Sequence, residues 1–220
     1  MILKPADRKS WLAARQQGLG GSDAGAAIGA NKYKSNIDLW REKTGLIVPE
    51  DISDKPAVKF GKEAERHIRE LFKLEHPEYN VDYHEFYMYL NDTYPFIYAT
   101  LDGELTDAEG RRGVLEIKTA TIQSPSQWDE WFDGKEPRIP DSYYAQILHQ
   151  LAATGWEYVI LVAYIRVAYA TEGSAKVRIF ERRVERVDVK TDINFLVEKE
   201  AEFWQAVRNR TQPPRLLPDI

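Results

Sequence analysis

Residues 114–119 have the sequence Val114-Leu-Glu-Ile-Lys-Thr119, along which apolar and charged side chains alternate. A two-residue period of this kind is typical of a β-strand with two different faces. Successive side chains of a strand point to opposite faces, so Glu116 and Lys118 project from the same one. The segment therefore predicts a strand that carries a carboxylate and an ammonium group side by side.

A second strand is predicted just upstream, at residues 96–105, which are rich in aromatic and β-branched side chains. The turn-rich connection Thr106-Asp-Ala-Glu-Gly-Arg-Arg-Gly113 joins it to residues 114–119 and indicates a β-hairpin. The hairpin can bring Asp102, late in the first strand, close to Glu116 in the second.

Two carboxylates from neighbouring strands form an oxygen-rich pocket that suits a hard divalent cation. Mg²⁺ accepts few protein ligands together with waters and phosphate oxygens. The carbonyl oxygen of Ile117 is a further candidate ligand, and Lys118 would bind the attacking water and offset the charge of a phosphate. Asp102, Glu116, Ile117 and Lys118 therefore predict a site for Mg²⁺-assisted phosphodiester hydrolysis, with Mn²⁺ as a substitute ion.

An ordinary structural interpretation competes with this one. Alternating charged and apolar residues are normal for half-exposed strands, and an Asp-Gly pair is usually a turn. Glu116 and Lys118 alone would more often form a solvated ladder than a catalytic site. Agreement among several features along the chain is needed to favour catalysis.

The spacing of apolar residues, together with glycine, proline and capping residues, predicts the remaining elements. Helices are predicted at residues 11–18, 24–30, 37–43, 56–75, 140–154 and 192–208. Strands are predicted at residues 81–90, 96–105, 114–119, 157–168 and 176–187, the last two joined by residues 170–174. The order predicts one α/β domain over residues 1–220, with a mixed β-sheet flanked by helices.

Individual residues fix several of these boundaries. Ser22 and Asn36 are predicted to cap the helices that follow them. Gly45 and Gly155 are predicted to end helices, and Pro56 suits a first helical turn.

The composition is that of a folded chain. Its 220 residues are 43% hydrophobic and 30% charged, which is enough for a core and argues against disorder. The absence of cysteine excludes disulfide scaffolds, thiolate zinc sites, iron–sulfur clusters and thiol catalysis. No apolar run approaches the roughly 18 residues of a membrane span, and the first residues do not form a signal peptide. We therefore expect a soluble intracellular protein that does not bind a membrane.

The charge balance argues against a protein that passively coats DNA. The formal net charge is −5, whereas such a protein should be strongly basic. Metal-binding carboxylates would lower the sum, so nucleic acid is not excluded. Basic residues gather in two regions: Lys4, Arg8, Lys9, Arg15, Lys32 and Lys34, and then Lys176, Arg178, Arg182, Arg183, Arg186 and Lys190. From charge alone, both regions are best interpreted as ordinary solvated faces.

Asp102 followed by Glu116-Ile-Lys118 resembles the PD-(D/E)xK nuclease pattern, with Leu101 where the pattern has proline. Further motifs resemble one branch of it, the phage lambda exonuclease and YqaJ-like viral recombinase family. They are Trp11-x-x-x-Arg15, Gly20-Gly-Ser-Asp-Ala24, Leu39-Trp-x-x-Lys43-Thr-Gly45, Gly61-Lys-x-x-Glu65, Ala99-Thr-x-Asp-Gly103 and Tyr144-Ala-Gln-Ile-x-His-Gln-Leu151. A lone E-x-K is weak, but the ordered set is specific, and it extends to about residue 165.

The resemblance adds two residues to the predicted active site. It places Glu65 near the metal, directly or through water, although Glu65 could instead pair with Arg69, four residues along the same helix. It also identifies Gln146 as the active-site glutamine, for which Lys118 or a metal-bound water would be a partner. For Gln150 a functional and an ordinary helix-border role remain equally open. His149 is treated as structural.

The resemblance also places Arg15, Ser22 and Thr100 in a pocket for the 5′-terminal phosphate of DNA. A guanidinium grips phosphate through paired hydrogen bonds. Ser22 would stand at a helix N-terminus, where backbone amides favour anions. The alternative is that Arg15 makes a surface ion pair and Ser22 only caps a helix.

The family resemblance implies a Mg²⁺-dependent 5′→3′ exonuclease that degrades one strand of linear double-stranded DNA from a 5′-phosphorylated end. It would leave 3′ single-stranded overhangs for phage recombination in the cytoplasm of a bacterial host cell. The resemblance further implies a homotrimeric ring around DNA and a single-strand annealing protein as partner. The alternatives are a restriction-like or structure-specific endonuclease, and an inactive module that binds DNA ends.

Overall fold

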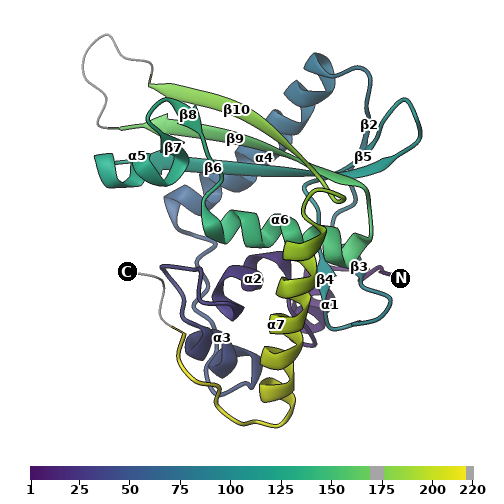
Figure 1. Ribbon diagram of the computed structural model, residues 1–220, viewed down its shortest axis with the longest axis vertical. Coiled ribbons are helices and arrows are strands. Elements are labelled where there is room, and N and C mark those ends of the chain that lie inside the picture. The colour runs from purple at the N-terminus through teal and green to yellow at the C-terminus, as the bar shows by residue number, and fades with distance from the viewer. Residues whose placement is uncertain (169–175, 217–220) are drawn as a thin grey trace.

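A mixed five-stranded sheet forms the centre of the computed structural model, which describes residues 1–168 and 176–216 (Figure 1). Its strand order is β10-β9-β6-β5-β2. These strands are β2 (Asn80–Asp82), β5 (Gly103–Thr106), β6 (Arg112–Ile122), β9 (Tyr158–Val167) and β10 (Val177–Glu185). Strands β6 and β9 are parallel, and the other neighbours are antiparallel. The predicted class, a mixed sheet flanked by helices, is confirmed.

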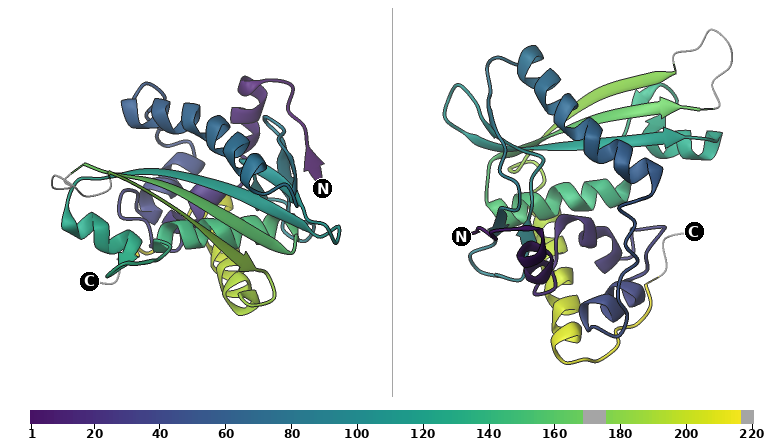
Figure 2. Two further views of the ribbon diagram at one scale, coloured as in Figure 1. Left: turned by 90° about the horizontal axis from the view of Figure 1, so that it is seen from above. Right: turned by 180° about the vertical axis from the view of Figure 1, so that it is seen from behind.

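Helices cover both faces of this sheet. They are α1 (Arg8–Arg15), α2 (Gly21–Ala27), α3 (Asn36–Lys43), α4 (Pro56–Glu75), α5 (Pro125–Trp131), α6 (Asp141–Thr154) and α7 (Lys190–Arg208). The view from behind in Figure 2 shows α4 crossing one face of the sheet, and Figure 1 shows α6 beneath the sheet, on the other face. Helices α2, α3 and α7 form a further layer below α6 (Figures 1 and 2). No helix in the described parts of the chain is both long and apolar enough to cross a membrane.

The alternation along β6 assigns its side chains to the two faces. Leu115 and Ile117 are buried in a cluster with Phe72 of α4. Val114 is buried on the opposite face, in a cluster with Ile147 and Leu151 of α6. Because alternate residues of a strand share a face, Glu116 and Lys118 lie on the α6 side with Val114. The segment that predicted the sheet therefore also points its charges at a helix.

The two predicted strands before the hairpin are each divided, so their predicted continuity is wrong. Residues 81–90 contribute β2 to the central sheet and β3 (Met88–Leu90) to a second one. Residues 96–105 contribute β4 (Tyr98–Ala99) to that second sheet and β5 to the central one. The second sheet has the order β1-β3-β4, with β1 at Ile2–Leu3. Strand propensity does not say which sheet a residue joins, because pairing partners are distant in sequence.

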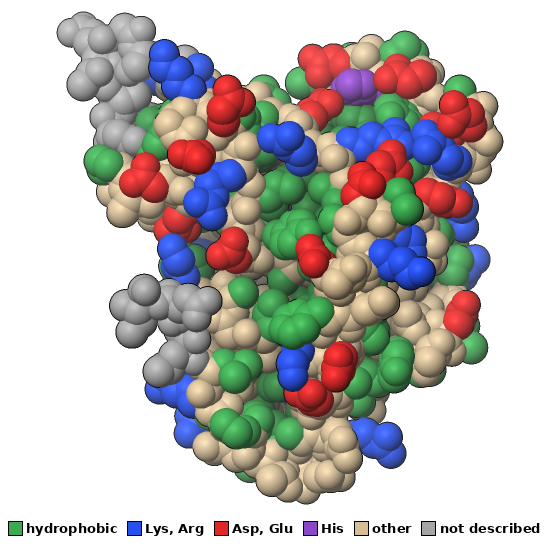
Figure 3. Space-filling view, viewed as in Figure 1, with side chains coloured by type: hydrophobic (Ala, Val, Ile, Leu, Met, Phe, Trp, Pro, Cys, Tyr) green, Lys and Arg blue, Asp and Glu red, His purple; other side chains and the backbone are tan. Residues whose placement is uncertain are grey.

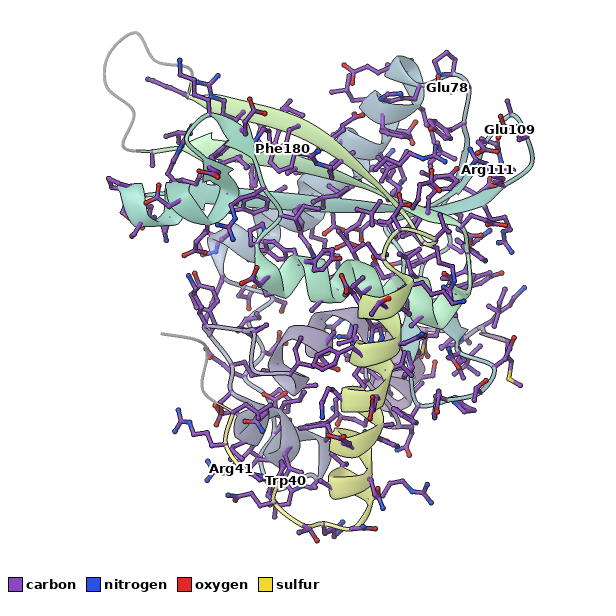
Figure 4. The ribbon with its side chains drawn as sticks, viewed as in Figure 1. Trp40, Arg41, Glu78, Glu109, Arg111 and Phe180 are labelled. Atoms are coloured by element: carbon purple, nitrogen blue, oxygen red, sulfur yellow. The ribbon has the colours of Figure 1, made fainter. Side chains whose placement is uncertain are left out.

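Residues 123–139 contain elements that the sequence did not predict. Helix α5 is followed by the short hairpin of β7 (Phe132–Asp133) and β8 (Glu136–Pro137). Phe180 of β10 packs on this unit, with its ring centroid 6.0 Å from that of Trp131 and 6.1 Å from that of Phe132 (Figure 4). Aromatic burial of this kind fixes a short helix that local propensity would leave marginal. The predicted connection at 170–174 lies outside the described residues.

Two predicted caps are displaced. The residue that caps α3 is Ser35, whose hydroxyl accepts from the Asp38 amide, whereas Asn36 is the first helical residue. The buried Asn36 side chain instead donates to the Pro214 carbonyl and accepts from the Leu216 amide. Ser22 lies within the first turn of α2, after the cap residue Gly20. Gly155 does end α6, with φ of +71°, as predicted.

A buried ion pair joins α6 to α7. Nδ1 of His149 lies 2.6 Å from Oε1 of Glu200, and its Nε2 donates to the Tyr98 carbonyl at 2.8 Å. Neither side chain is exposed to solvent. Burial alone would lower the pKa of His149, but the Glu200 carboxylate raises it by more, and the net shift is upward. Both ring nitrogens therefore have acceptors, which supports the structural role expected for His149.

Glu200→Gln should destabilise the fold by roughly 3 kcal/mol, because removing one partner strands a buried charge. Because the pKa of His149 is raised in the fold, its ion pair contributes its full stabilisation below about pH 6.5, the ordinary pKa of histidine. This contribution is lost as the pH rises through the pKa that His149 has in the fold. The difference between wild type and variant should therefore shrink from pH 6 to pH 9 in urea unfolding. Glu198→Gln, an exposed change on the same helix, is the control. A difference that grew with pH would contradict a cationic His149.

Candidate active site

The site begins where β5 stops running beside β6. Pairing ends at Gly103 opposite Leu115, and beyond that point no strand among residues 1–168 and 176–216 pairs with this edge of β6. The Ile117 amide on this edge donates to Oδ2 of Asp102 at 2.8 Å. The amide and carbonyl of one strand residue point to the same edge. The Ile117 carbonyl therefore faces the side on which Asp102 lies.

Glu116 and Lys118 form a closed group with Gln146 of α6. Oε1 of Glu116 lies 2.6 Å from Nζ of Lys118 and accepts from Nε2 of Gln146 at 2.6 Å. Lys118 also donates to Oε1 of Gln146 at 2.9 Å. Glu116 is only 2% exposed, so its charge depends on these donors. Of the two partners considered for Gln146, the structure shows Lys118.

Gln150 belongs to the same group. Its Nε2 donates to Oε2 of Glu116, and the side chain is buried. Both oxygens of Glu116 therefore receive an amide from α6, one from Gln146 and one from Gln150. This contact favours the functional one of the two roles left open for Gln150, which stays a prediction. The spacing of four residues from Gln146 was the available signal, because it places both amides on one helix face.

Glu65 does not pair with Arg69. Within the described chain Arg69 instead donates to the main-chain carbonyl of Asp102, and its guanidinium lies over the Tyr83 ring. Glu65 is half-buried on α4, on the side of the site opposite α6. Burial, and then the charge of Glu116, raise the pKa of Glu65 above its ordinary value. The placement of Glu65 near a metal stays a prediction of the family resemblance.

The carboxylates crowd one another. Burial raises the pKa of Asp102 well above its ordinary value, and the charges of Glu116 and Glu65 raise it further. Burial alone would lower the pKa of Lys118, but Glu116 and Asp102 raise it by more. One ammonium group thus faces three acids. Like charges held together in a buried place disfavour one another's ionised form, and a bound cation would relieve this repulsion.

These residues fit a hard divalent cation. Asp102, Glu116, Glu65 and the Ile117 carbonyl offer only oxygen, which Mg²⁺ prefers. The oxygens of Glu116 are engaged by Lys118 and the two glutamines, so the acids do not converge as tightly as metal ligands would. A bound ion would compete with those donors for Glu116.

A different group has a tighter arrangement. Ligand atoms of Glu75, His76 and Glu181 lie within 4.8 Å of one another, at the far end of α4. His76 is already paired with Glu181 at 2.9 Å and with Glu78 at 3.2 Å. Burial lowers and these acids raise the pKa of His76, with a net upward shift. The group is therefore described as an ion-pair cluster on the surface.

The N-terminal residues lie beside the same site. Nη2 of Arg15 is 3.5 Å from Oγ of Ser22, and the guanidinium lies 4.5 Å from the centroid of the Trp11 ring. A side chain at Gly21 would meet Cγ of Gln146 at 3.0 Å, so the start of α2 touches the Gln146 side chain. Thr100 is half-buried, two residues before Asp102. Arg15 and Ser22 are therefore close together, and Gly21, the neighbour of Ser22, lies against Gln146.

Asp23 and Lys43 explain two of the recognised motifs. Asp23 is buried, and its Oδ2 lies 2.8 Å from Nζ of Lys43. Burial raises the pKa of Asp23, but Lys43 lowers it by more. Lys43 also donates to the main-chain carbonyl of Arg15 at 3.1 Å. This pair ties α3 to α2 and to the end of α1, a contact that no local pattern in the sequence predicts.

The charged surface contains no single basic field on the face that Figure 3 shows. Lys and Arg side chains lie intermixed with Asp and Glu there. In the second basic region, Arg183 is paired with Glu185 at 2.6 Å and donates to the hydroxyl of Tyr79. The interpretation of that region as an ordinary face therefore fits Arg183.

The fold and the open edge of β6 define a class of α/β proteins with a restriction-endonuclease-like sheet, and solved structures share the fold. An alkaline exonuclease, LHK-Exo, from Laribacter hongkongensis matches 92% of this chain and 97% of its own, with TM-score 0.58 and 22% identity. Its complex with dAMP gives TM-score 0.58 and 24% identity over the same shares. A phage-related exonuclease from Haemophilus somnus 129PT matches 88% of this chain and 96% of its own, with TM-score 0.53 and 14% identity.

Sequence comparison identifies the family. Residues 10–157 match the YqaJ-like viral recombinase domain. The uncharacterized protein YqaJ of Bacillus subtilis (strain 168) is 31% identical over 210 residues, which are 90% of this chain and 55% of the relative. The chain therefore belongs to the YqaJ-like viral recombinase family, as its motifs indicated. It spans about half the length of the curated relative that it matches.

Asp102→Asn should raise the melting temperature in EDTA by a few degrees, because it removes one crowded acid and keeps an oxygen for the Ile117 amide. The ionised Asp102 carboxyl begins to destabilise the fold above about pH 3.9, the ordinary pKa of aspartate in an unfolded chain. The full destabilisation is present above the raised pKa that Asp102 has in the fold. The gain should therefore be present at pH 8 and absent near pH 4. Mg²⁺ should raise the melting temperature of wild type but not of this variant.

The exposed Glu63 on α4 supplies the control, since Glu63→Gln should leave both measurements unchanged. A variant that melted lower than wild type in EDTA at pH 8 would contradict the crowding. An equal Mg²⁺ response in both proteins would remove Asp102 from the metal site.

Proposed function

We propose that this protein is a Mg²⁺-dependent 5′→3′ exonuclease that degrades one strand of linear double-stranded DNA from a 5′-phosphorylated end and leaves 3′ overhangs. The observation that carries the proposal is the crowded acidic group at the open edge of β6, with Lys118 inside it. Support comes from the family and from fold relatives that are themselves exonucleases, one of them solved with dAMP.

Asp102, Glu116, the Ile117 carbonyl and Glu65 would hold the ion. A bound Mg²⁺ would activate a water and neutralise charge on the scissile phosphate. Lys118 then has two tasks: it orients the attacking water, and it offsets the negative charge that develops on the phosphate oxygens. Gln146 and Gln150 keep the Glu116 carboxylate in one orientation through its two oxygens.

Polarity would come from Arg15, with Ser22 and Thr100. The Arg15 guanidinium is held by the Trp11 ring and lies next to Ser22, which leaves its remaining donors for a phosphate. Because Gly21 touches Gln146, a phosphate bound there would lie close to the acidic group. The family further suggests a homotrimeric ring, a single-strand annealing partner, and a role in phage recombination in the bacterial cytoplasm. These stay proposals.

Two other activities use the same residues in part. A restriction-like or structure-specific endonuclease would need the acidic group but not the Arg15 pocket, and an inactive end-binding module would need neither metal nor Lys118. Linear and closed circular duplex DNA together separate the three activities. An exonuclease digests only the linear form, an endonuclease cuts both forms, and a binder cuts neither.

With Mg²⁺, wild type should digest linear duplex and spare closed circles, while Glu116→Ala should be inactive. Lys118→Ala should still bind DNA ends in Ca²⁺ but lose about 100-fold in rate, since charge stabilisation of this kind is worth roughly 3 kcal/mol. Rates and anisotropy on the same fluorescent duplex measure both effects. Lys73→Ala, on the remote end of α4, should behave as wild type. An active Lys118→Ala enzyme would end its assigned role.

Wild type should also digest 5′-phosphorylated duplex much faster than 5′-hydroxyl duplex. Arg15→Ala should reduce this preference, because charge-assisted hydrogen bonds worth about 1.5–3 kcal/mol exist only with the phosphate. Its rate on 5′-hydroxyl ends should change little, whereas Lys118→Ala slows both substrates equally. Initial rates on the matched pair provide the measurement. Undiminished preference in Arg15→Ala would show that the pocket lies elsewhere.

A further inference from the structure

Tyr83 is an aromatic side chain that is 46% exposed and yet fixed in place. The guanidinium carbon of Arg69 lies 3.8 Å from the centroid of its ring, so one face of the ring is covered by a cation. Arg69 itself is buried, and it donates to the main-chain carbonyl of Asp102. One guanidinium therefore separates the Tyr83 ring from the backbone of the central acid of the site.

The strand register also places Tyr83 beside Arg69 and close to Asp102. Pairing of β2 with β5 ends at Asp82 opposite Glu104, so the next residue, Tyr83, is level with Gly103. Tyr83 shares the α4 face with Val81, two residues earlier. A side chain at Gly103 would meet Leu115 at 3.2 Å and Cδ of Arg69 at 3.6 Å, so glycine leaves room for the Arg69 stem.

The turn that carries Tyr83 is strained and reaches the other part of the site. Phe86 has φ of +67°, a conformation that a bulky side chain adopts only when its surroundings impose it. Its ring packs on Trp11, with centroids 5.9 Å apart, and Trp11 lies under Arg15. Residues 83–87 thus connect the Asp102 group to the Arg15 group through two aromatic–cation contacts.

We propose that the exposed part of the Tyr83 ring is a stacking subsite for a nucleobase, the base of the terminal nucleotide on the strand that enters the acidic group. The subsite rests on the exonuclease function proposed above and specifies how the substrate is held. A terminal base has only one stacking neighbour in the duplex, so it leaves the duplex at low cost. Stacking on an aromatic ring is tolerant of sequence, which suits an enzyme that must accept every base in turn.

Arg69 holds the Tyr83 ring in one orientation before any base binds. A side chain already immobilised by a cation loses little further freedom when a base stacks on it. Burial, and then the charge of Glu85, raise the pKa of the Tyr83 hydroxyl, and Asp102 and Glu65 act in the same direction. A purely structural Tyr83 would serve only to cover Arg69.

The test uses paired linear duplexes that are identical except that the 5′-terminal nucleotide is normal or abasic. Wild type should show a KM about tenfold higher on the abasic end, in the lower range of what base–aromatic stacking supplies. Tyr83→Ala should raise KM about tenfold on the normal end and show no further loss on the abasic end, with kcat little changed. Tyr83→Phe should match wild type. Tyr94→Ala, an exposed ring of another loop, is the control.

A Tyr83→Ala protein that remained as sensitive to the missing base as wild type would overturn the proposal, and so would a wild type indifferent to it. If Tyr83→Ala fails to fold in a thermal melt, Tyr83→Leu keeps apolar cover without a ring and carries the same expectation. Anisotropy of both duplexes in Ca²⁺ tests the base contact without hydrolysis. Failure of the proposed exonuclease function is thereby separated from failure of the subsite.

Discussion

The early end of β5 beside β6 is the constraint on which the site depends. If β5 and β6 had continued to pair past Gly103 and Leu115, the Ile117 amide and carbonyl would have been hydrogen-bonded to the neighbouring strand. Instead the amide is satisfied by the Asp102 carboxylate. A buried backbone donor must find an acceptor, so the open edge holds Asp102 in place.

One face of helix α6 packs in the core, and another face of the same turns contacts the site. Ile147 and Leu151 fill the apolar cluster under the sheet, while Gln146 and Gln150 reach the Glu116 oxygens. His149 anchors the helix from behind through Glu200. A carboxylate kept in a fixed orientation in a buried place is unfavourable for stability, and the anchored helix offsets that cost. Proteins commonly accept such local destabilisation where chemistry requires it.

The sequence predicted what short-range patterns determine. The spacing of Glu116 and Lys118 gave their common face, the hairpin gave the proximity of Asp102, and the ordered motifs gave the family. Contacts between distant elements had no local signal. Tertiary packing determines the pairing of Asp23 with Lys43 and the burial of Glu200. It also determines the division of residues 96–105 into β4 and β5 just before Gly103. Gln150 lay between these cases, because helical spacing linked it to Gln146 but could not show what the two amides faced.

The negative net charge is compatible with the proposed substrate because the relevant cations are not on an open surface. Lys118 faces Glu116, Arg69 is buried against Asp102, and Arg15 is held by Trp11. Under the proposed function, cations held in this way would meet only a strand that enters the site and would release few counterions along the rest of a duplex. Affinity would then come from the end of the DNA rather than from its length. The net charge of −5 would oppose binding of the internal phosphates, whereas the fixed cations and a bound metal would attract the terminal ones.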